Sequence, residues 1–424
     1  MNDGLNEYYN SDNGGADFVG MNKAKNGDEG TSSGYDFKLD YVHPFENKSK
    51  LEVGLASKST DRGDTQIAEI FDEATNQYVS DRSFSNEFIY NETVHAAYLQ
   101  YSGNLWLFGI NAGGRYEMVD MLSELKTTNE RFENPYSSFY PSLSVTFGAP
   151  QLVQIQTSYS KRVNRPRSRM LNPFSSRQDE RNLRIGNPFL KPEYTDSYEI
   201  NFSRFSRGLS LSLGGYYRHT TDKMTRFKEV REDGVSIATY KNLEEQNTRG
   251  IDYSIVGSLG QKLRLMFSGS VYWDEINSEL FGSDYDKTAQ GQRLRLTTMW
   301  NINPTTEFMF FIFYMPGRDI AIGKMDAMSF SSMSVKKKFM DERLNLTLNV
   351  GDPFGLSGFG FESWGDLDED GVRDWYQDSN RNWNSQSIRL TLEYRFGKME
   401  DRSRFSRQRR GEGMQMEEGS GEIF

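Results

Sequence analysis

Apolar and polar residues alternate along much of the chain from residue 35 onward. Residues 343–350 read Arg-Leu-Asn-Leu-Thr-Leu-Asn-Val, and residues 388–396 keep the same period of two. Such alternation gives a strand one apolar and one polar face, and no comparable helical periodicity accompanies it. The pattern predicts an all-β protein with about fifteen strands. The predicted strands are 35–43, 50–58, 92–102, 105–118, 138–147, 152–162, 194–205, 209–220, 249–259, 262–274, 292–302, 306–316, 327–339, 343–352 and 386–396.

The connections between these strands alternate strictly between short and long. Tight turns on one rim and long loops on the other are typical of an antiparallel up-and-down transmembrane β-barrel, with the short turns in the periplasm. A soluble sandwich has no reason to sort its loops in this way. Short turns lie near 44–49, 103–104, 148–151, 206–208, 260–261, 303–305 and 340–342, and long segments near 59–91, 119–137, 163–193, 221–248, 275–291, 317–326 and 353–385.

The composition agrees with a barrel. Mean hydropathy is −0.73 and aromatic residues reach 14%. No apolar run of about 18 residues predicts a membrane helix, whereas a barrel strand needs only about 10 residues with alternate apolar side chains. The absence of cysteine excludes a disulfide framework and a cysteine zinc site. The net charge of −10 gives no support to a nucleic-acid partner.

The two ends of the chain differ from its centre. Counting strands back from the last one makes residues 1–34 the end of an external loop or a disordered segment. Residues 35–396 are then the barrel portion, and residues 397–424, with an arginine run followed by glutamates, are expected to be a disordered charged periplasmic tail. The odd strand number and the lack of a signal peptide lead us to expect an incomplete barrel, the carboxyl-terminal piece of a longer one.

One motif resembles a known family. Residues 186–193, Gly-Asn-Pro-Phe-Leu-Lys-Pro-Glu, lead into a predicted strand and resemble a hallmark of TonB-dependent receptor barrels. Residues 158–166 and 171–174 resemble the matching region of one subgroup, the outer-membrane β-barrel family, and residues 387–397 resemble its closing strand. Pro188 and Pro192 lack an amide hydrogen, so strand pairing starts only after residue 192. The expected role of the motif is structural, through Gly186, Asn187, Pro188, Leu190, Lys191, Pro192 and Glu193.

The resemblance implies active uptake of a small nutrient across the outer membrane of a Gram-negative cell. In the family, a 22-stranded barrel holds an amino-terminal plug, and a contact segment engages the TonB complex. Neither is recognisable in this sequence, so contact with TonB would come only through upstream regions. The implied partners are outer-membrane lipid and an unknown nutrient, with iron chelates, glycans, peptides and vitamins all open.

A predicted external loop contains a candidate calcium site. Asp366, Asp368, Asp370 and Asp374, with Gly371 between them, form the opening of a calcium-binding loop, in which alternate carboxylates converge on one cation. The twelfth position holds Gln377 where a bidentate Glu is expected. Two interpretations stay open, a Ca²⁺ site and an acidic, solvated loop. No other cofactor is expected.

The polar faces of the predicted strands carry charges that would line the lumen, among them Arg264, Arg293 and Arg295. They either pair across strands or hold a plug, or they form a substrate path with some preference for anions. The three histidines lie on separate strands, and no nucleophile or phosphate-binding motif is present. We therefore expect no enzyme. The alternatives to a transporter barrel are a passive or structural barrel without energy coupling, and a soluble all-β surface-binding protein.

Overall fold

The structure is a computed structural model. It describes residues 2–12, 17–72, 74–81, 85–148, 153–174, 176–179, 182–231, 235–277, 286–320, 323–365, 375–381 and 385–396. In these residues, a 20-stranded sheet and a separate 4-stranded sheet hold all the strands. The calcium motif and residues 397–424 lie outside the described residues.

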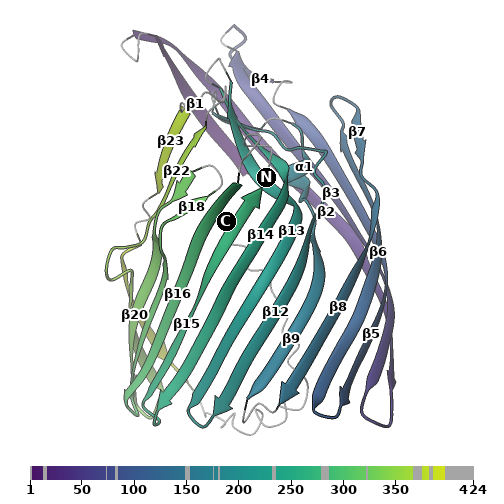
Figure 1. The fold of residues 1–424 in the computed structure, drawn as a ribbon. Helices are drawn as coiled ribbons and strands as arrows, with labels where there is room; N and C mark the ends of the chain where they lie inside the picture. Colours follow the sequence, from purple (N-terminus) through teal and green to yellow (C-terminus); the bar gives the residue numbers. More distant parts are fainter. Residues whose placement is uncertain are drawn as a thin grey trace.

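The large sheet forms a curved wall of long antiparallel strands (Figure 1). Each predicted strand corresponds to one strand of this wall, so the predicted all-β, antiparallel architecture is confirmed. In wall order these are β2 (Asp17–Pro44), β3 (Lys50–Asp72), β5 (Asn86–Leu105), β6 (Phe108–Leu125), β8 (Tyr136–Gly148), β9 (Gln154–Asn164), β12 (Glu193–Ser206), β13 (Leu209–Val230), β14 (Ser236–Leu259), β15 (Leu263–Asn277), β16 (Asp286–Asn303), β17 (Thr306–Met315), β20 (Met328–Phe339), β21 (Leu344–Gly351) and β24 (Ser387–Tyr394).

Strand pairing continues far into segments predicted as loops. Residues 1–34 were expected to be a loop end or disordered, but β1 (Asn2–Asp12) pairs with the first part of β2. Hairpins outside the membrane keep their backbone pairing while needing no apolar face, so they show no alternation in the sequence. The other elements that the sequence did not predict are β4 (Gln77–Ser80), β7 (Glu130–Glu133), α1 (Ser168–Leu171), β10 (Ser176–Asp179), β11 (Asn182–Arg184), β18 (Arg318–Ile320), β19 (Gly323–Met325), β22 (Phe359–Gly365) and β23 (Trp375–Arg381).

The two rims differ as the loop lengths predicted. Tight turns join the wall strands at the lower rim, and long extensions rise from the upper rim (Figure 1). Gly208 and Gly260 lie in two of these turns with φ of 86° and 63°, a conformation that glycine adopts without steric cost. No helix among the described residues has both the length and the apolar character needed to cross a membrane.

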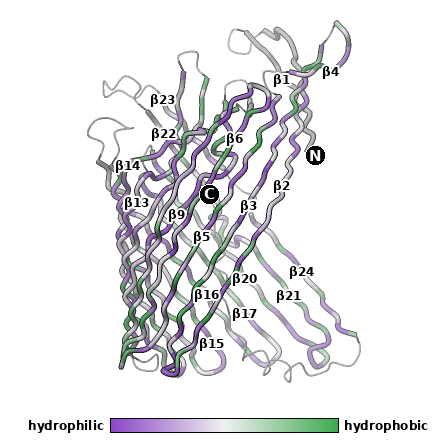
Figure 2. The backbone as a smooth tube through the Cα atoms, turned by 90° about the vertical axis from the view of Figure 1, so that its right-hand side faces the viewer, coloured by the Kyte–Doolittle hydropathy of each residue, from purple (hydrophilic) through white to green (hydrophobic). Residues whose placement is uncertain are grey.

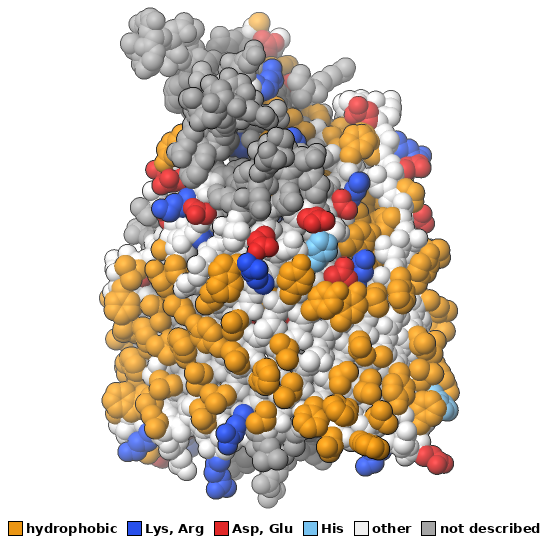
Figure 3. Space-filling model, viewed as in Figure 1, with side chains coloured by type: hydrophobic (Ala, Val, Ile, Leu, Met, Phe, Trp, Pro, Cys, Tyr) orange, Lys and Arg blue, Asp and Glu red, His pale blue; other side chains and the backbone are white. Residues whose placement is uncertain are grey.

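The wall is apolar outside and polar inside. Phe37 and Leu39 on β2 are 59% and 58% exposed, and Ile200 on β12 is 41% exposed. Residues that face each other across the ladder share one face, and the register assigns these side chains to the outer surface. In Figure 3 apolar side chains form a broad band around the visible face, with charged residues above it and at the lower rim. A soluble protein would bury such a band, whereas lipid is its natural solvent.

Aromatic side chains form a row on the outer face. Tyr159, Tyr198 and Tyr217 are direct cross-strand partners on β9, β12 and β13. Their ring centroids lie 5.0 Å apart for the first pair and 6.4 Å for the second. Amphipathic rings gather where hydrocarbon meets head groups. The row therefore marks the external membrane interface at the height of Tyr198.

The sheet is not closed into a complete barrel within the described residues. β24 pairs only with β21, and β2 has β1 beside it only over Asp17–Asp28. The two edges, β2 and β24, diverge in the view of Figure 2.

A charge on the outer face should destabilise the protein, whereas one on the inner face should not. Ile200→Arg places a guanidinium in hydrocarbon, and we expect the free energy of unfolding in phospholipid vesicles to fall by about 2–4 kcal/mol. Ser203→Arg on the same strand points to the inner face and serves as the matched control, with an expected change below about 1 kcal/mol. Denaturant titration followed by tryptophan fluorescence measures both, and equal losses would contradict the assignment of faces.

Candidate functional site

Residues 165–174, 176–179 and 182–192, here called the mouth loop, lie at the external end of the lumen. This loop joins β9 and β12, which have 11 and 14 residues, while the nearby β13 and β14 have 22 and 24. α1 lies near the upper rim of the wall (Figure 1).

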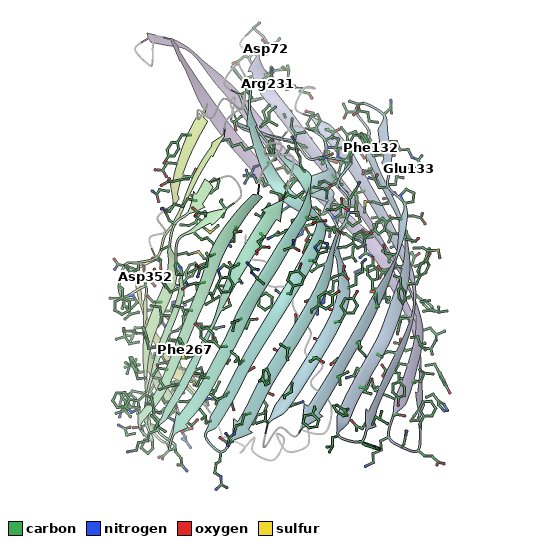
Figure 4. The ribbon with its side chains drawn as sticks, in the orientation of Figure 1. Asp72, Phe132, Glu133, Arg231, Phe267 and Asp352 are labelled. Atoms are coloured by element: carbon green, nitrogen blue, oxygen red, sulfur yellow. The ribbon has the colours of Figure 1, made fainter. Side chains whose placement is uncertain are left out.

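A cluster of buried apolar side chains holds the mouth loop against the wall. Leu171 of α1 is fully buried and Leu190 is 2% exposed. Both pack with wall residues from the inner face of β5 and β6. The ring of Phe132 on β7 (Figure 4) meets that of Phe189 edge-on, with the ring centroids 5.5 Å apart. Burying each large apolar side chain contributes about 1.5–3 kcal/mol. The wall members of the cluster are Phe88, Tyr90, Met121 and Leu125.

A buried ion pair fixes the start of the loop. The guanidinium of Arg165 contacts the carboxylate of Glu117 on β6, and its Nε donates to Tyr136 Oη at 2.7 Å. Arg115 Nε donates to the other carboxylate oxygen of Glu117 at 2.6 Å. Glu117 is 6% exposed. Removing one partner would leave a buried charge without its counter-ion, which is strongly destabilising.

The first half of the Gly-Asn-Pro motif closes onto the backbone of α1. The amide of Gly186 donates to Asn172 O at 2.8 Å, and that of Asn187 donates to Met170 O at 2.7 Å. A Cβ at Gly186 would lie 2.5 Å from Asn172 O and 2.7 Å from Met170 O. This close approach requires glycine.

The motif also binds the walls on both sides. Asn187 Nδ2 donates to the carbonyl of Tyr240 on β14 at 3.1 Å. From the opposite side, Asn134 Nδ2 donates to the carbonyl of Pro188 at 2.8 Å. The motif therefore ties together parts of the rim that are far apart in sequence.

The last residue of the motif, Glu193, is a buried carboxylate at the start of β12. It is 6% exposed and accepts hydrogen bonds from Asn164 Nδ2 at 2.8 Å and from the amide of Met224 at 3.0 Å. The Lys223 ammonium lies 3.4 Å away. Two donors and one cation compensate the cost of burying this charge. These contacts tie the end of the motif to β9 and β13, and its structural role stays a prediction.

Above the loop lies a cavity, here called the mouth pocket, with a volume of about 630 Å³. Its walls come from β2 and β3 on one side and from the mouth loop, β13 and β14 on the other. Carboxylates line the first wall and guanidiniums the second. The charged lining residues are Asp28, Glu29, Asp64, Arg169, Arg184 and Arg226.

A second cavity, of about 340 Å³, lies on the inner face of β13–β16 and is here called the lumen patch. Arg318 from β18 reaches into it, donating to Tyr272 Oη at 2.8 Å, with Asp274 Oδ2 3.7 Å away. The guanidinium of Arg293 lies 5.5 Å from the centre of the Tyr272 ring. The patch presents arginines and tyrosines to the lumen, together with two aspartates. Its other lining residues are Tyr216, Arg218, Thr248, Asp252 and Ser270.

The structure places the predicted lumen arginines in different surroundings. The register puts all three on the inner face, with Arg293 opposite Ser270, Arg295 opposite Ser268 and Arg264 opposite Met299. Arg293 belongs to the lumen patch, while Arg295 lies 5.2 Å from the ring centre of Phe311. Arg264 is closer to the periplasmic turn.

The predicted metal chemistry receives no further support. Asp366, Asp368, Asp370 and Asp374 lie outside the described residues, so the calcium loop stays a prediction. In the part of the chain that the structure describes, no group of three His, Asp or Glu side chains could hold a metal.

Sequence reasoning missed both cavities. The charged residues of the mouth pocket, and Arg318 of the lumen patch, lie in segments predicted as loops. The other charged residues of the lumen patch, Arg218, Asp252, Asp274 and Arg293, lie in predicted strands. Charges are common in loops, so no signal in the sequence distinguishes these residues from solvated ones.

A third buried carboxylate, Asp352, anchors the chain after β21 (Figure 4). It accepts hydrogen bonds from Ser385 Oγ at 2.6 Å and from the amides of Leu356 and Ser357 at 3.1 Å. Burial favours the neutral acid, but these donors prevail and lower the pKa of Asp352.

Comparison with known proteins identifies the family. The model of the outer membrane protein beta-barrel family matches residues 1–394. The chain belongs to this family. The predicted location, the outer membrane of a Gram-negative cell, follows from that membership and from the apolar band. No curated protein matches the chain.

Solved structures with the same fold are transport proteins of the outer membrane. The copper transporter OprC is 11% identical with a TM-score of 0.62, covering 89% of this chain and 58% of its own. The unliganded ferric citrate transporter FecA is 12% identical with a TM-score of 0.61, covering 92% and 57%. The ferric yersiniabactin uptake receptor FyuA from Yersinia pestis is 11% identical with a TM-score of 0.57, covering 90% and 56%.

At this identity the likeness concerns the fold. These structures are TonB-dependent receptors, so the resemblance drawn from residues 186–193 is confirmed at that level. The chain spans less than two thirds of the length of each of them.

The close packing of Gly186 predicts that Gly186→Ala releases the mouth loop. The added methyl group forces two carbonyls apart, and we expect trypsin cleavage after Arg167 or Arg169 in intact cells to accelerate about tenfold through local opening. Gly257→Ala is the matched control, because its Cβ would meet only Leu209 Cδ1 at 4.0 Å. Unchanged cleavage in the Gly186 variant would show that the contact does not hold the loop.

The lowered pKa of Asp352 predicts an acid-dependent contribution to stability. Its native pKa lies below the ordinary value of 3.8, so the contribution is complete above that pH and is lost as pH falls through the native pKa. The difference in free energy of unfolding between wild type and Asp352→Asn should therefore shrink between pH 7 and pH 3. Asp341→Asn, in an exposed turn, serves as control, and a pH-independent difference for Asp352 would refute the prediction.

Proposed function

We propose that this chain is the barrel region of a TonB-dependent receptor that takes up a small nutrient across the outer membrane. The observation that carries the proposal is the charged inner face, which runs from the mouth pocket past the lumen patch within an apolar-banded wall. A structural barrel has no need of cavities lined by arginine, aspartate and tyrosine at both levels of its lumen. Ligand sites typically combine such convergent polar groups with a cavity of about 300–1,000 Å³.

The fold supports transport as the general role. OprC is named a copper transporter, FecA a ferric citrate transporter and FyuA an uptake receptor for ferric yersiniabactin. All three solutes are small, and passage of a small solute fits the dimensions of the mouth pocket. No enzymatic activity is part of the proposal.

Energy coupling and divalent cations are further parts of the proposal. Contact with the TonB complex would come through regions other than those described above. Asp366, Asp368, Asp370 and Asp374 would bind Ca²⁺ in an external loop. The arginines of the inner face, including Arg293 and Arg295, would guide anionic groups through the lumen.

The main alternative is a passive or structural barrel without energy coupling. The buried contacts that hold the mouth loop against the wall are compatible with it. A soluble surface-binding protein is excluded, because family membership and the exposed apolar band both locate the chain in the membrane.

Uptake in cells lacking the gene tests the proposal. We expect the deletion strain to lose uptake of at least one labelled nutrient among ferric chelates, copper, glycans, vitamins and short peptides. A protonophore should reduce wild-type uptake to the deletion level, because transport draws on inner-membrane energy. Uptake that survives the protonophore would favour the passive barrel.

The lumen arginines can be tested in the same cells. Arg293→Gln combined with Arg295→Gln should lower uptake of an anionic solute severalfold, since each removes a positive charge from the path. Arg249→Gln on the outer face of β14 is the control. Equal uptake in the wild-type, double-variant and control strains would show that these arginines do not contribute to transport.

A further inference from the structure

We propose that the mouth pocket binds short peptides as dipolar solutes, with the carboxylate end on the arginine wall and the ammonium end on the acidic wall. This inference rests on the proposed uptake function and names a substrate class for it. The charges of the pocket, one polar atom without a partner among the described residues and the apolar base of the pocket support it.

Within the described residues, the charges of the two walls are separated and have no ion-pair partner. Asp28 and Glu29 lie on β2 and Asp64 on β3, while Arg169, Arg184 and Arg226 lie on the opposite side. Fifteen ion pairs within 4.0 Å are found among the described residues, and none of them involves any of these six. Elsewhere on the inner face arginine and carboxylate groups do meet, as Arg218 and Glu199 do at 3.3 Å. Asp28, Asp64 and the three arginines therefore present charge without an ion-pair partner among the described residues to one cavity, whereas the side chain of Glu29, next to Asp28 on the same strand, points to the opposite face.

A buried acceptor without a partner also lines this cavity. Asn86 on β5 is 4% exposed, and its Oδ1 accepts no hydrogen bond in the described structure. A buried polar atom without a partner costs free energy that a ligand donor would recover. A backbone amide of a peptide is such a donor, whereas a ferric carboxylate chelate offers none.

The base of the pocket accepts the body of such a solute. Phe174 of the mouth loop and Tyr240 of β14 line the cavity and also pack on the buried cluster below it. Their rings give an apolar surface fixed by the wall. A volume of about 630 Å³ is large enough to hold a peptide of several residues.

The opposing charges select against solutes of a single sign. A polyanion attracted by the three guanidiniums would face the carboxylates of Asp28 and Asp64 across the cavity, and a polycation attracted by these carboxylates would face the guanidiniums. A solute with one charge of each sign at its two ends satisfies both walls. The termini of a free peptide, an ammonium and a carboxylate, carry these two charges whatever the sequence of the peptide.

Binding of alanine tripeptides to the purified full-length protein in detergent tests the inference. Trialanine with free ends should bind measurably by calorimetry, while the N-acetylated and the C-amidated forms should each bind about tenfold more weakly or less, because each loses one charged contact. Equal binding of the three peptides, or no binding of the free form, would overturn the proposal.

Variants locate the two ends. Arg226→Gln should abolish the advantage of the free form over the C-amidated form while leaving the penalty of N-acetylation. Asp64→Asn should do the reverse, and Arg249→Gln on the outer face should change neither. Heat-dependent mobility in electrophoresis verifies that each variant is folded, and folded variants with unchanged preferences would also overturn the proposal.

Failure of this inference is distinguishable from failure of the uptake function. Suppose that the deletion strain loses energy-dependent uptake of a ferric chelate and that all peptides bind equally. This result would support the transport function and reject peptides as the substrate class. Peptide binding with no uptake defect for any solute would retain the pocket and reject the transporter.

Discussion

Backbone amides and carbonyls that face hydrocarbon have no water to bond, so a chain in the outer membrane must satisfy them by pairing strand with strand. This constraint explains the long antiparallel ladders and the tight turns at the lower rim. Lipid on one side and polar solvent on the other then impose the period of two along each strand. The apolar outer band and the charged inner face are two consequences of the same ladder.

The ladder by itself leaves the ends of the lumen open, and the mouth loop occupies one of them. Its anchors differ in kind: an apolar cluster around Leu171 and Leu190, a buried ion pair between Arg165 and Glu117, and the backbone bonds of Gly186. Apolar burial supplies most of the stabilisation, while the polar contacts fix one position for the loop. The shape of the mouth pocket therefore depends on the fixed position of the loop.

Charge on the inner face is used in two ways. Some groups are neutralised by direct partners, as Glu117, Glu193 and Asp274 are, and these hold the wall and the loop in place. Others, above all Arg226 and Asp64, line a cavity and have no ion-pair partner in the part of the chain that the structure describes. The first kind serves the fold, and the second kind is free to recognise a solute.

The sequence by itself determined the fold class, the strand order and the distinction between the two rims. Each strand alternates because one of its faces contacts lipid and the other the lumen, and loop length differs between the two rims, so both features can be read locally. It also located the motif at residues 186–193. It did not predict β1 or the upper parts of β3, β13 and β14, since pairing outside the membrane leaves no apolar face to read. Only the tertiary structure brought Asp28, Asp64, Arg169 and Arg226 to one cavity, because curvature of the wall joins strands that are distant in sequence.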